Sequence, residues 1–505
     1  MNASGTAPTS APLCRGRVPA TWLLGFLVVC RVLLMVLAPH TDPTEARYAE
    51  MARKMVETGD WITPQFDYGT PFWSSPPLGL WFSALGIDLF GANEFGSRIF
   101  IFAAALAVLW LVAGTARREL GTGMDRLAAA LLLGMPLFFY CSAAVMNELI
   151  LTLGITLAMV SFRVAFQTGS RGHGYAVFAG LAIGLLAKGP LALALALPPL
   201  AAWLAVTGHW RRAWRSVPWL SGSLLMLAAT VPWYVVAERK TPGFLAYFLR
   251  VESWGRYLPS GWTWDPYGNG HDVMPGLVWL YAGLGSFPWC LMLLRRSRPQ
   301  PARALHDDAR GLYWLLWAVW PLCLFTPLNN VIASTPLPAL PPLALLLAGR
   351  FRSRHPADSG RVPTLHPGPT VACAAVVVGA LVVSVFFPSV APKQSERGLV
   401  RRYEKEREDG DHLVYYGSRR SSAEFYSEGS VDHTTSPAEL AEKLAAPGRL
   451  FVAMPDKLLK FVPPPVRRRL ELVQSWGPMS ALYAERPEVP GMTRIDPSLS
   501  APIGN

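Results

Sequence analysis

The sequence has little charge: Asp, Glu, Lys and Arg make up 16% of its 505 residues, whereas 51% of the residues are hydrophobic. A soluble domain usually carries about 25% charged residues, so a single water-soluble globule is excluded. Long apolar stretches recur between Thr21 and Pro388. Many reach about 18 residues or more, which is enough to cross a bilayer as a helix. The composition therefore predicts a polytopic α-helical membrane protein.

Cysteine is also scarce, and five of the six cysteines lie within apolar runs. The six cysteines are Cys14, Cys30, Cys141, Cys290, Cys323 and Cys373. Their spacing is neither that of a disulfide framework nor that of a zinc site. The region after residue 390 has no Gly-rich phosphate loop and no Cys/His cluster. We therefore expect no cofactor.

The net charge of +12 does not indicate a nucleic-acid partner, because Lys and Arg cluster in short loops between apolar runs. Such clustering is what orientation in a membrane requires. Residues 1–20 form a short polar tail with Arg15 and Arg17. The next stretch, TWLLGFLVVCRVLLMVLAP, has no small-residue cleavage site after it. We expect a retained first span rather than a removed signal peptide.

The apolar runs predict about 11 membrane spans. They cover residues 21–39, 95–116, 127–145, 149–166, 174–187, 190–207, 218–237, 273–294, 312–327, 335–349 and 369–388. With residues 1–20 on the cytoplasmic side, the strongly basic loops all fall on that side. HWRRAWR (209–215) and RRSRPQPAR (295–303) are examples.

The opposite side receives the outer loops 40–94 and 238–272, three short polar turns and the C-terminal domain, 390–505. The turns are Asn147–Glu148, Lys188–Gly189 and Asn329–Asn330. The transmembrane domain is then 21–389. In the C-terminal domain, HLVYYG (412–417) and RLFVAMP (449–455) are typical of strands. SPAELAEKLAA (436–446) predicts a helix capped by Ser436, so we expect a small α/β domain outside the membrane.

The stretch HTDPTEARYAE (40–50) admits a structural and a functional interpretation. Asp42, Pro43 and Glu45 resemble a capping box, with the acceptor at the N-cap and Glu at the third helical position. An apolar stripe follows at helical spacing, from Tyr48 to Val56. This pattern predicts an amphipathic helix in the membrane interface, with Glu50 and Lys54 paired on its surface.

Several collinear stretches resemble a known family. They are EARYAEMARKMVETGDWITPQF (45–66), PPLGLWFSALGIDLFGANEFGSR (76–98), LAKGPLALAL (186–195), TPGFLAYFLRVESWGRYL (241–258) and TPLNNVIASTPLPALPPLALLLAG (326–349). Together they resemble the GT-C glycosyltransferases, in the protein-mannosyltransferase-like group that includes the lipid A aminoarabinose transferases. The resemblance covers about residues 20–350, and the C-terminal domain is also similar to the group's outer domain. It implies the GT-C fold and a donor sugar linked to a polyprenyl phosphate.

Such a transferase needs a carboxylate to take a proton from the acceptor hydroxyl. It also needs cations or dipoles to stabilise the departing lipid phosphate. The candidates for the base are Asp42, Glu45 and Glu148, of which Asp42 and Glu45 are favoured at this stage. The candidates for substrate binding are Arg47, Tyr48, Lys188, Glu252 and Arg256. Glu252 and Arg256 have the alternative of pairing with each other across one helical turn.

The chain departs from the family's motifs at several positions. Thr44 replaces the first of two adjacent acids, and Ser74-Ser75 replace a Glu-Lys pair that includes a phosphate-binding lysine. Asn147-Glu148 stand where the family has an Asp, and Asn329-Asn330 where a basic turn is frequent. Ser253 replaces a histidine, and with this His and the Glu before Pro76 both absent we expect no bound metal.

The leading hypothesis is a glycosyltransferase of the bacterial inner membrane, with its active site and C-terminal domain outside the cytoplasm. Its partners would be a polyprenyl-phosphate-sugar donor, membrane lipids and an acceptor such as lipid A, another glycolipid, a polymer or a protein. The alternative is a divergent, non-catalytic homologue that binds a polyprenyl phosphate. A transporter is less favoured, because no internal repeat is visible.

Overall fold

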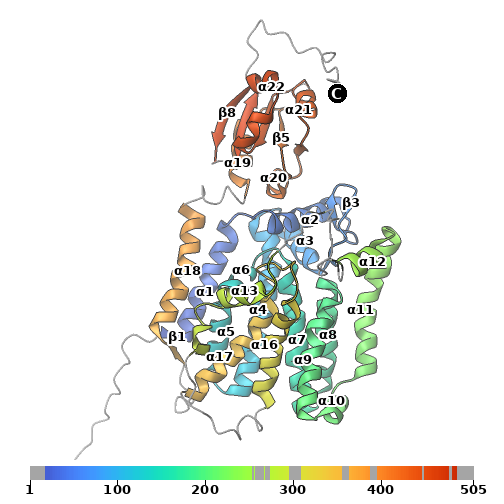
Figure 1. The fold of residues 1–505 in the computed structure, drawn as a ribbon, viewed down its shortest axis with the longest axis vertical. Coiled ribbons are helices and arrows are strands. Elements are labelled where there is room, and N and C mark those ends of the chain that lie inside the picture. Colours follow the sequence, from blue (N-terminus) through green and yellow to red (C-terminus); the bar gives the residue numbers. More distant parts are fainter. Residues whose placement is uncertain are drawn as a thin grey trace, which may run out of the picture.

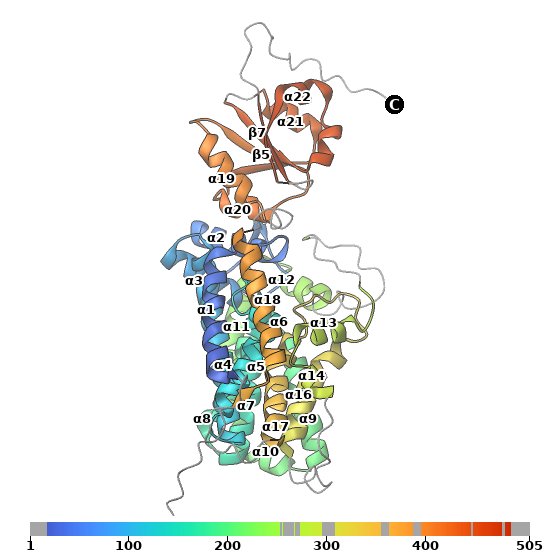
Figure 2. The ribbon, with the colours of Figure 1, turned by 90° about the vertical axis from the view of Figure 1, so that its left-hand side faces the viewer.

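The protein is a bundle of helices with a small β-sheet unit standing on one end (Figures 1 and 2). The structure is a computed structural model that describes residues 18–252, 255, 267, 273–294, 309–354, 363–386, 395–445, 448–476 and 480–485. Within these residues, four helices are long and apolar enough to cross a membrane. They are α1 (Ala20–Leu37), α4 (Glu94–Leu120), α7 (Asn147–Thr168) and α11 (Trp219–Lys240).

Further helices complete the bundle, along its sides and at its two ends. They are α5 (Met124–Leu133), α6 (Pro136–Cys141), α8 (Arg171–Lys188), α9 (Leu191–Thr207), α10 (Trp210–Ser216), α12 (Phe244–Ala246), the π-helix η1 (Tyr247–Glu252), α13 (Leu277–Gly285), α14 (Leu291–Leu294), α16 (Ala309–Phe325), η3 (Leu337–Ala339), α17 (Leu340–Arg354) and α18 (Pro367–Phe386). The outer surface of the bundle is apolar: Trp22 is 75% exposed and Leu220 is 78% exposed. Such a surface suits lipid, so the prediction of a helical polytopic membrane protein is confirmed.

Two predicted spans are wrong as single helices. Residues 127–145 are divided into α5 and α6, because Pro136 has no N–H to continue the first helix. Residues 273–294 are divided into α13 and α14 on either side of Pro288. In each case the hydropathy remains high across the break between the two helices, so an apolar run alone does not reveal the break.

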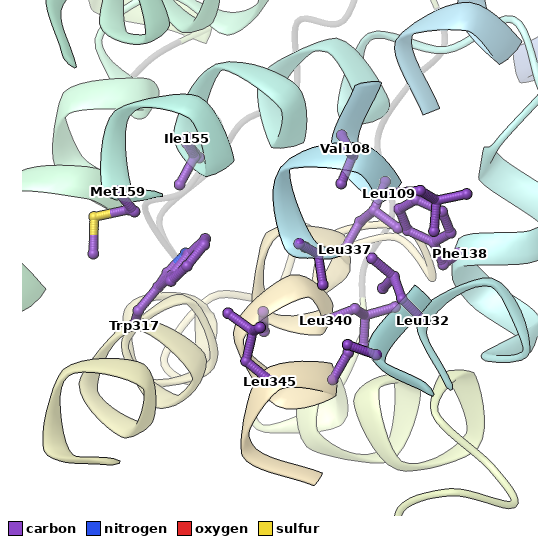
Figure 3. Packing of buried hydrophobic residues seen from close by; sticks show 14 of the residues in the cluster. Val108, Leu109, Leu132, Phe138, Ile155, Met159, Trp317, Leu337, Leu340 and Leu345 are labelled. Carbon is purple, nitrogen blue, oxygen red and sulfur yellow. The ribbon is translucent and has the colours of Figure 1, made fainter. Parts of the chain in front are cut away.

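The core of the bundle is built from long-range apolar contacts. Figure 3 shows side chains of α4, α5, α7, α16 and α17 meeting there, among them Leu132, Ile155, Trp317 and Leu345. All four are buried. Because lipid tails are as apolar as leucine, helices in a bilayer associate through close packing rather than through transfer out of water.

Helices α7 and α8 approach each other closely. A Cβ added to Gly154 would lie 2.6 Å from the Gly180 carbonyl oxygen. A Cβ added to Gly180 would lie 2.5 Å from the Gly154 oxygen and 2.6 Å from the Ala158 nitrogen. Small residues at this contact let the two backbones touch. This contact fixes the position of α7 along α8, and therefore where the ends of the two helices lie relative to each other.

The first outer loop covers one end of the bundle. It contains α2 (Thr44–Thr58), the hairpin of β2 (Gln65–Asp67) and β3 (Thr70–Pro71), and α3 (Leu78–Phe90), which was not predicted. Helix α2 lies across the end of the bundle, beneath the sheet (Figure 1). The predicted amphipathic helix is therefore present.

Two details predicted for α2 are wrong. Its N-cap is Pro43, and the Asp42 carboxylate accepts hydrogen bonds from the backbone and side chain of Ser422 instead of capping the helix. Glu50 and Lys54, expected on the surface, are 2% and 1% exposed. The C-terminal unit covers them, and a partner several hundred residues away cannot be inferred from helical periodicity.

The C-terminal unit is a five-stranded sheet, in the order β6-β5-β7-β9-β8 within the described residues. Strands β6, β5 and β7 are parallel, whereas β9 is antiparallel to both of its neighbours. The strands are β5 (His412–Tyr416), β6 (Val431–Thr434), β7 (Leu450–Met454), β8 (Leu470–Ser475) and β9 (Ala481–Glu485). The helices are α19 (Arg397–Glu406), α20 (Ser421–Tyr426), α21 (Pro437–Lys443), η5 (Asp456–Phe461) and α22 (Pro464–Arg469).

Local patterns in this unit behave as predicted. The two expected strands are β5 and β7, and the expected helix is α21. The Ser436 side chain caps α21 by accepting a hydrogen bond from the backbone N–H of Glu439.

The basic helix ends gather at the end of the bundle opposite the sheet, near α10 (Figures 1 and 2). There the Arg163 guanidinium at the end of α7 donates to Glu119 of α4, and Arg310 of α16 donates to the Glu119 carbonyl. At the same end, β1 (Val18–Pro19) pairs with β4 (Thr364–Leu365). The predicted basic cluster 295–303 lies outside the described residues.

Replacing Gly180 by Ala should separate α7 from α8. The added methyl meets backbone atoms, which cannot turn away as a side chain can, so we expect a loss of about 1–3 kcal/mol of stability. Thermal unfolding of the purified protein in detergent measures it. Gly114→Ala is the matched control, because a Cβ there has no atom within 4 Å. Equal stability of the two variants would contradict the close contact.

Glu396 should make the C-terminal unit sensitive to pH. Burial raises the pKa of this carboxyl from 4.5 to about 7, although Ser480 and Tyr415 donate hydrogen bonds to it. The folded state thus favours the protonated form, and the stability that this form contributes below pH 4.5 is lost as the pH rises through about 7. Glu396→Gln should therefore gain stability over wild type at about pH 8.5 but not at about pH 5. Thermal unfolding at the two pH values tests this, and a difference independent of pH would contradict it.

Candidate active site

A cavity of about 430 Å³ lies at the end of the bundle that carries the first outer loop. It is placed where α7 and α9 begin and where α8 and α16 end. Its polar lining consists of Ser74, Glu148, Lys188, Glu252, Asn330 and Thr335. Its apolar lining consists of Leu151, Pro190, Leu191, Ala194, Leu195, Phe248, Leu324, Phe325, Pro327, Leu328, Ile332 and Pro338. The cavity is thus amphiphilic.

An ion pair between Glu148 and Lys188 lies in this polar lining. The Lys188 Nζ atom is 3.0 Å from the Glu148 Oε1 atom, and both side chains are partly accessible. Glu148 lies in the first turn of α7, and Lys188 is the last residue of α8. Each charge therefore complements the dipole of its own helix end. The glycine contact between α7 and α8 brings the two helices together.

The turn after Lys188 leaves room for Phe248, a cavity residue of the second outer segment. Gly189 has a φ of +63°, and a Cβ there would lie 2.5 Å from the ring of Phe248. Phe248 and Glu252 both belong to the π-helix η1. Such π-helical turns are frequent at functional sites.

The first outer loop contributes uncharged polar side chains at and next to the cavity. Ser74 lines the cavity, and the Asn147 side-chain amide donates to the Ser75 hydroxyl at 3.0 Å. The replacement of a charged pair by two serines thus falls directly at the cavity.

The favoured base candidates lie elsewhere: Asp42 and Glu45 are not among the described residues that line the cavity. Asp42 is half-buried against Ser422, and burial raises the pKa of its carboxyl while the bonds from Ser422 oppose this. Glu45 is buried, with its Oε1 atom accepting from the Arg98 Nε atom at 2.8 Å and lying 3.6 Å from the His40 Nδ1 atom. Although burial opposes ionisation, Arg98 and His40 hold the pKa of Glu45 below its ordinary range.

Two of the substrate-binding candidates on α2 are also outside the described lining. The Arg47 guanidinium donates to the Tyr267 carbonyl oxygen at 3.0 Å, and the Tyr48 ring packs edge-on against Phe72. Arg256 lies outside the described residues, and so does its predicted pairing with Glu252. The structure therefore brings together Glu148, Lys188 and Glu252 but leaves the acids of the first motif in separate contacts.

Sequence reasoning missed the partner of Glu45. Arg98 lies near the start of a predicted span, and its side chain is buried. A charged residue in such a position is costly unless it is paired, so the position itself signalled a buried partner. Among the residues that the structure describes, no group of three or more His, Cys, Asp and Glu side chains is arranged to hold a metal ion.

Residues 27–248 match the family described as dolichyl-phosphate-mannose-protein mannosyltransferase. The undecaprenyl phosphate-alpha-4-amino-4-deoxy-L-arabinose arabinosyl transferase of Edwardsiella ictaluri is 33% identical over 325 residues, which are 61% of this chain and 55% of that protein. The corresponding transferase of Erwinia tasmaniensis is 31% identical over 321 residues, which are 61% of this chain and 54% of the relative. The chain therefore spans about half the length of these relatives.

The fold is similar to that of ArnT from Cupriavidus metallidurans, in a crystal structure with bound undecaprenyl phosphate. The TM-score is 0.72 at 18% sequence identity, over 92% of this chain and 97% of that one. The predicted resemblance is confirmed by the family match, by the relatives and by this fold. The chain is therefore similar to this mannosyltransferase family over residues 27–248 and to the arabinosyl transferases over 61% of its length, and its fold is similar to that of ArnT.

Proposed function

We propose that the chain is a membrane glycosyltransferase that moves a sugar from a polyprenyl-phosphate-linked donor to an acceptor outside the cytoplasm. The observation that carries the proposal is the amphiphilic cavity with the Glu148–Lys188 pair among its polar groups. A polyprenyl phosphate has an anionic head and an apolar tail, so it matches both kinds of lining. The names of the relatives, which refer to an undecaprenyl phosphate donor, support this class of substrate.

The apolar wall suits the lipid part of the donor. Leu191 and Leu195 contribute it from the start of α9, and Leu324 and Phe325 from the end of α16. A lipid chain lying along this wall remains next to the bilayer while its phosphate approaches Lys188. A donor bound in this way needs no transfer of its tail into water.

The Glu148 carboxylate is the general base of the proposed reaction. It takes the proton of the acceptor hydroxyl, and the acceptor oxygen attacks the anomeric carbon of the sugar. The bond between that carbon and the phosphate oxygen breaks, and its electron pair leaves with the polyprenyl phosphate. The Lys188 ammonium stabilises the charge on this phosphate. A single displacement of this kind inverts the configuration at the anomeric carbon.

In this proposal neither Asp42 nor Glu45 is the general base. Both carboxylates already accept hydrogen bonds from buried neighbours, so a proton transfer to either of them would disrupt those contacts. We therefore assign them to positioning the first outer loop. The binding-only alternative is supported by the same contacts, because Glu45, the acid that matches the family motif, is paired with Arg98, and by the replacements at Thr44, Ser74 and Ser75.

The proposed location is the bacterial inner membrane, with the cavity and the C-terminal unit on the extracytoplasmic side. The arrangement of charge supports this: Arg211 and Arg215 of α10 are exposed at the end of the bundle far from the cavity. Basic residues are retained on the cytoplasmic side of bacterial membranes. The acceptor would then be lipid A, another glycolipid, a polymer or a protein.

Replacing Glu148 by Gln should lower sugar transfer by roughly 100- to 10,000-fold, because the variant cannot accept the proton. The assay incubates membranes with radiolabelled polyprenyl-phosphate sugars and an acceptor panel. Glu57→Gln is the matched control, since this carboxylate of α2 is 47% exposed and pairs with Arg53. An unchanged rate in Glu148→Gln would reject the proposed base. Binding of undecaprenyl phosphate by wild type without any transfer would establish the binding-only alternative.

The orientation predicts opposite labelling of two introduced cysteines. In a cysteine-free background, Asp409→Cys lies in the C-terminal unit and Arg211→Cys lies on α10, and both positions are exposed. A membrane-impermeant maleimide added to spheroplasts should modify the first cysteine but not the second. Labelling of both positions after lysis is the control. Labelling of the second position in intact spheroplasts would overturn the orientation.

A further inference from the structure

The C-terminal unit is joined to the first outer loop by buried polar contacts. The Ser422 backbone N–H and hydroxyl both donate to the Asp42 carboxylate. Ser422 is fully buried, and Phe425 of the same helix packs into the apolar cluster beneath α2. Helix α20 therefore packs directly against the first outer loop.

Ion pairs extend this contact along α2. The Lys54 Nζ atom lies 3.4 Å from the Glu424 Oε2 atom, and both residues are buried. Arg419 pairs with Glu424 and also with Asp67 of β2, where its Nη1 atom lies 2.9 Å from the Asp67 Oδ2 atom. Charges that are shielded from water and paired hold a geometry much more firmly than exposed ones.

From α2 the contact continues to Tyr267 of the second outer segment. Arg47 of α2 donates to the Tyr267 carbonyl oxygen at 3.0 Å. Phe66 of the hairpin also packs against the Tyr267 ring, with 5.2 Å between ring centres. Two routes from α20, through α2 and through β2, therefore converge on this tyrosine.

Tyr267 in turn contacts residues that lie next to the cavity lining along the chain, in both outer segments. Its hydroxyl donates to the Pro71 carbonyl oxygen at 2.9 Å and accepts from the Trp73 backbone N–H, and Trp73 precedes the cavity residue Ser74. Its ring packs edge-on against Tyr247 of η1, which precedes the cavity residue Phe248. A displacement of Tyr267 thus moves the first and the second outer segments together.

We propose that α2 and Tyr267 form a mechanical link through which docking of the C-terminal unit fixes the positions of the cavity residues Ser74 and Phe248. Arg47, Ser422 and Glu424 are then positioning residues: they act on Ser74 and Phe248 through Tyr267. The link is a property of the fold and exists without substrate. Only its effect on turnover rests on the proposed function.

Hydrogen exchange of the full-length protein in lipid nanodiscs tests the link. The double variant Ser422→Ala, Glu424→Gln weakens the docking contact, and it leaves Lys54 next to Glu50 and Asp67, at 3.6 and 3.5 Å. We expect amide exchange at residues 72–75 and 244–252 to become roughly five- to thirty-fold faster. Tyr267→Phe, which keeps the ring but loses both hydroxyl contacts, should accelerate the same two segments.

Two comparisons separate the link from general destabilisation. Arg47→Met should accelerate both segments, whereas Arg47→Lys, which retains a donor for the Tyr267 carbonyl, should restore most of the protection. Arg469→Gln breaks the ion pair with Glu485 inside the C-terminal unit and should leave both segments unchanged. Faster exchange confined to residues 397–429, or the same pattern in Arg469→Gln, would overturn the proposal. Because no substrate is present, neither result depends on whether the protein transfers a sugar.

Discussion

A charged side chain is costly in hydrocarbon, and this constraint organises the molecule around the pair of Glu148 and Lys188. Both charges lie at helix ends of favourable dipole, 3.0 Å apart and at one end of the bundle. They meet there because glycines let α7 and α8 touch. The cavity then follows, since the apolar starts and ends of α9 and α16 surround the same point. The packing of the helices thus determines where charged side chains can take part in a reaction.

Glu45, the acid that matches the family's first motif, and the nearby Asp42 both take part in contacts away from the cavity lining. Glu45 is neutralised by Arg98 beneath the first outer loop, and Asp42 receives two hydrogen bonds from Ser422. Both contacts attach the loop to something else, one to the bundle and one to the C-terminal unit. In the proposed enzyme they maintain the shape of the site while Glu148 accepts the proton. Residue type at a family position is therefore weaker evidence for a role than the partners of that residue.

Much of the architecture could be predicted from local patterns. Hydropathy located α1, α4, α7 and α11 to within a few residues, and Ser436 correctly indicated the start of α21. Lys188 was expected at a turn that ends a span, and it is the last residue of α8. The burial of Lys54 and the bond from Ser422 to Asp42 were not predictable, because their partners lie 370 and 380 residues away. Such contacts depend on how the C-terminal unit docks, which no periodicity encodes.

In the proposed enzyme, the Glu148–Lys188 cavity receives the head of a polyprenyl phosphate. An experimental structure of the full-length protein with undecaprenyl phosphate tests it most directly. We expect phosphate density within ion-pair distance, about 4 Å, of the Lys188 Nζ atom, with the lipid chain along α9 and α16. A phosphate bound elsewhere, with the Glu148–Lys188 cavity empty, would contradict it.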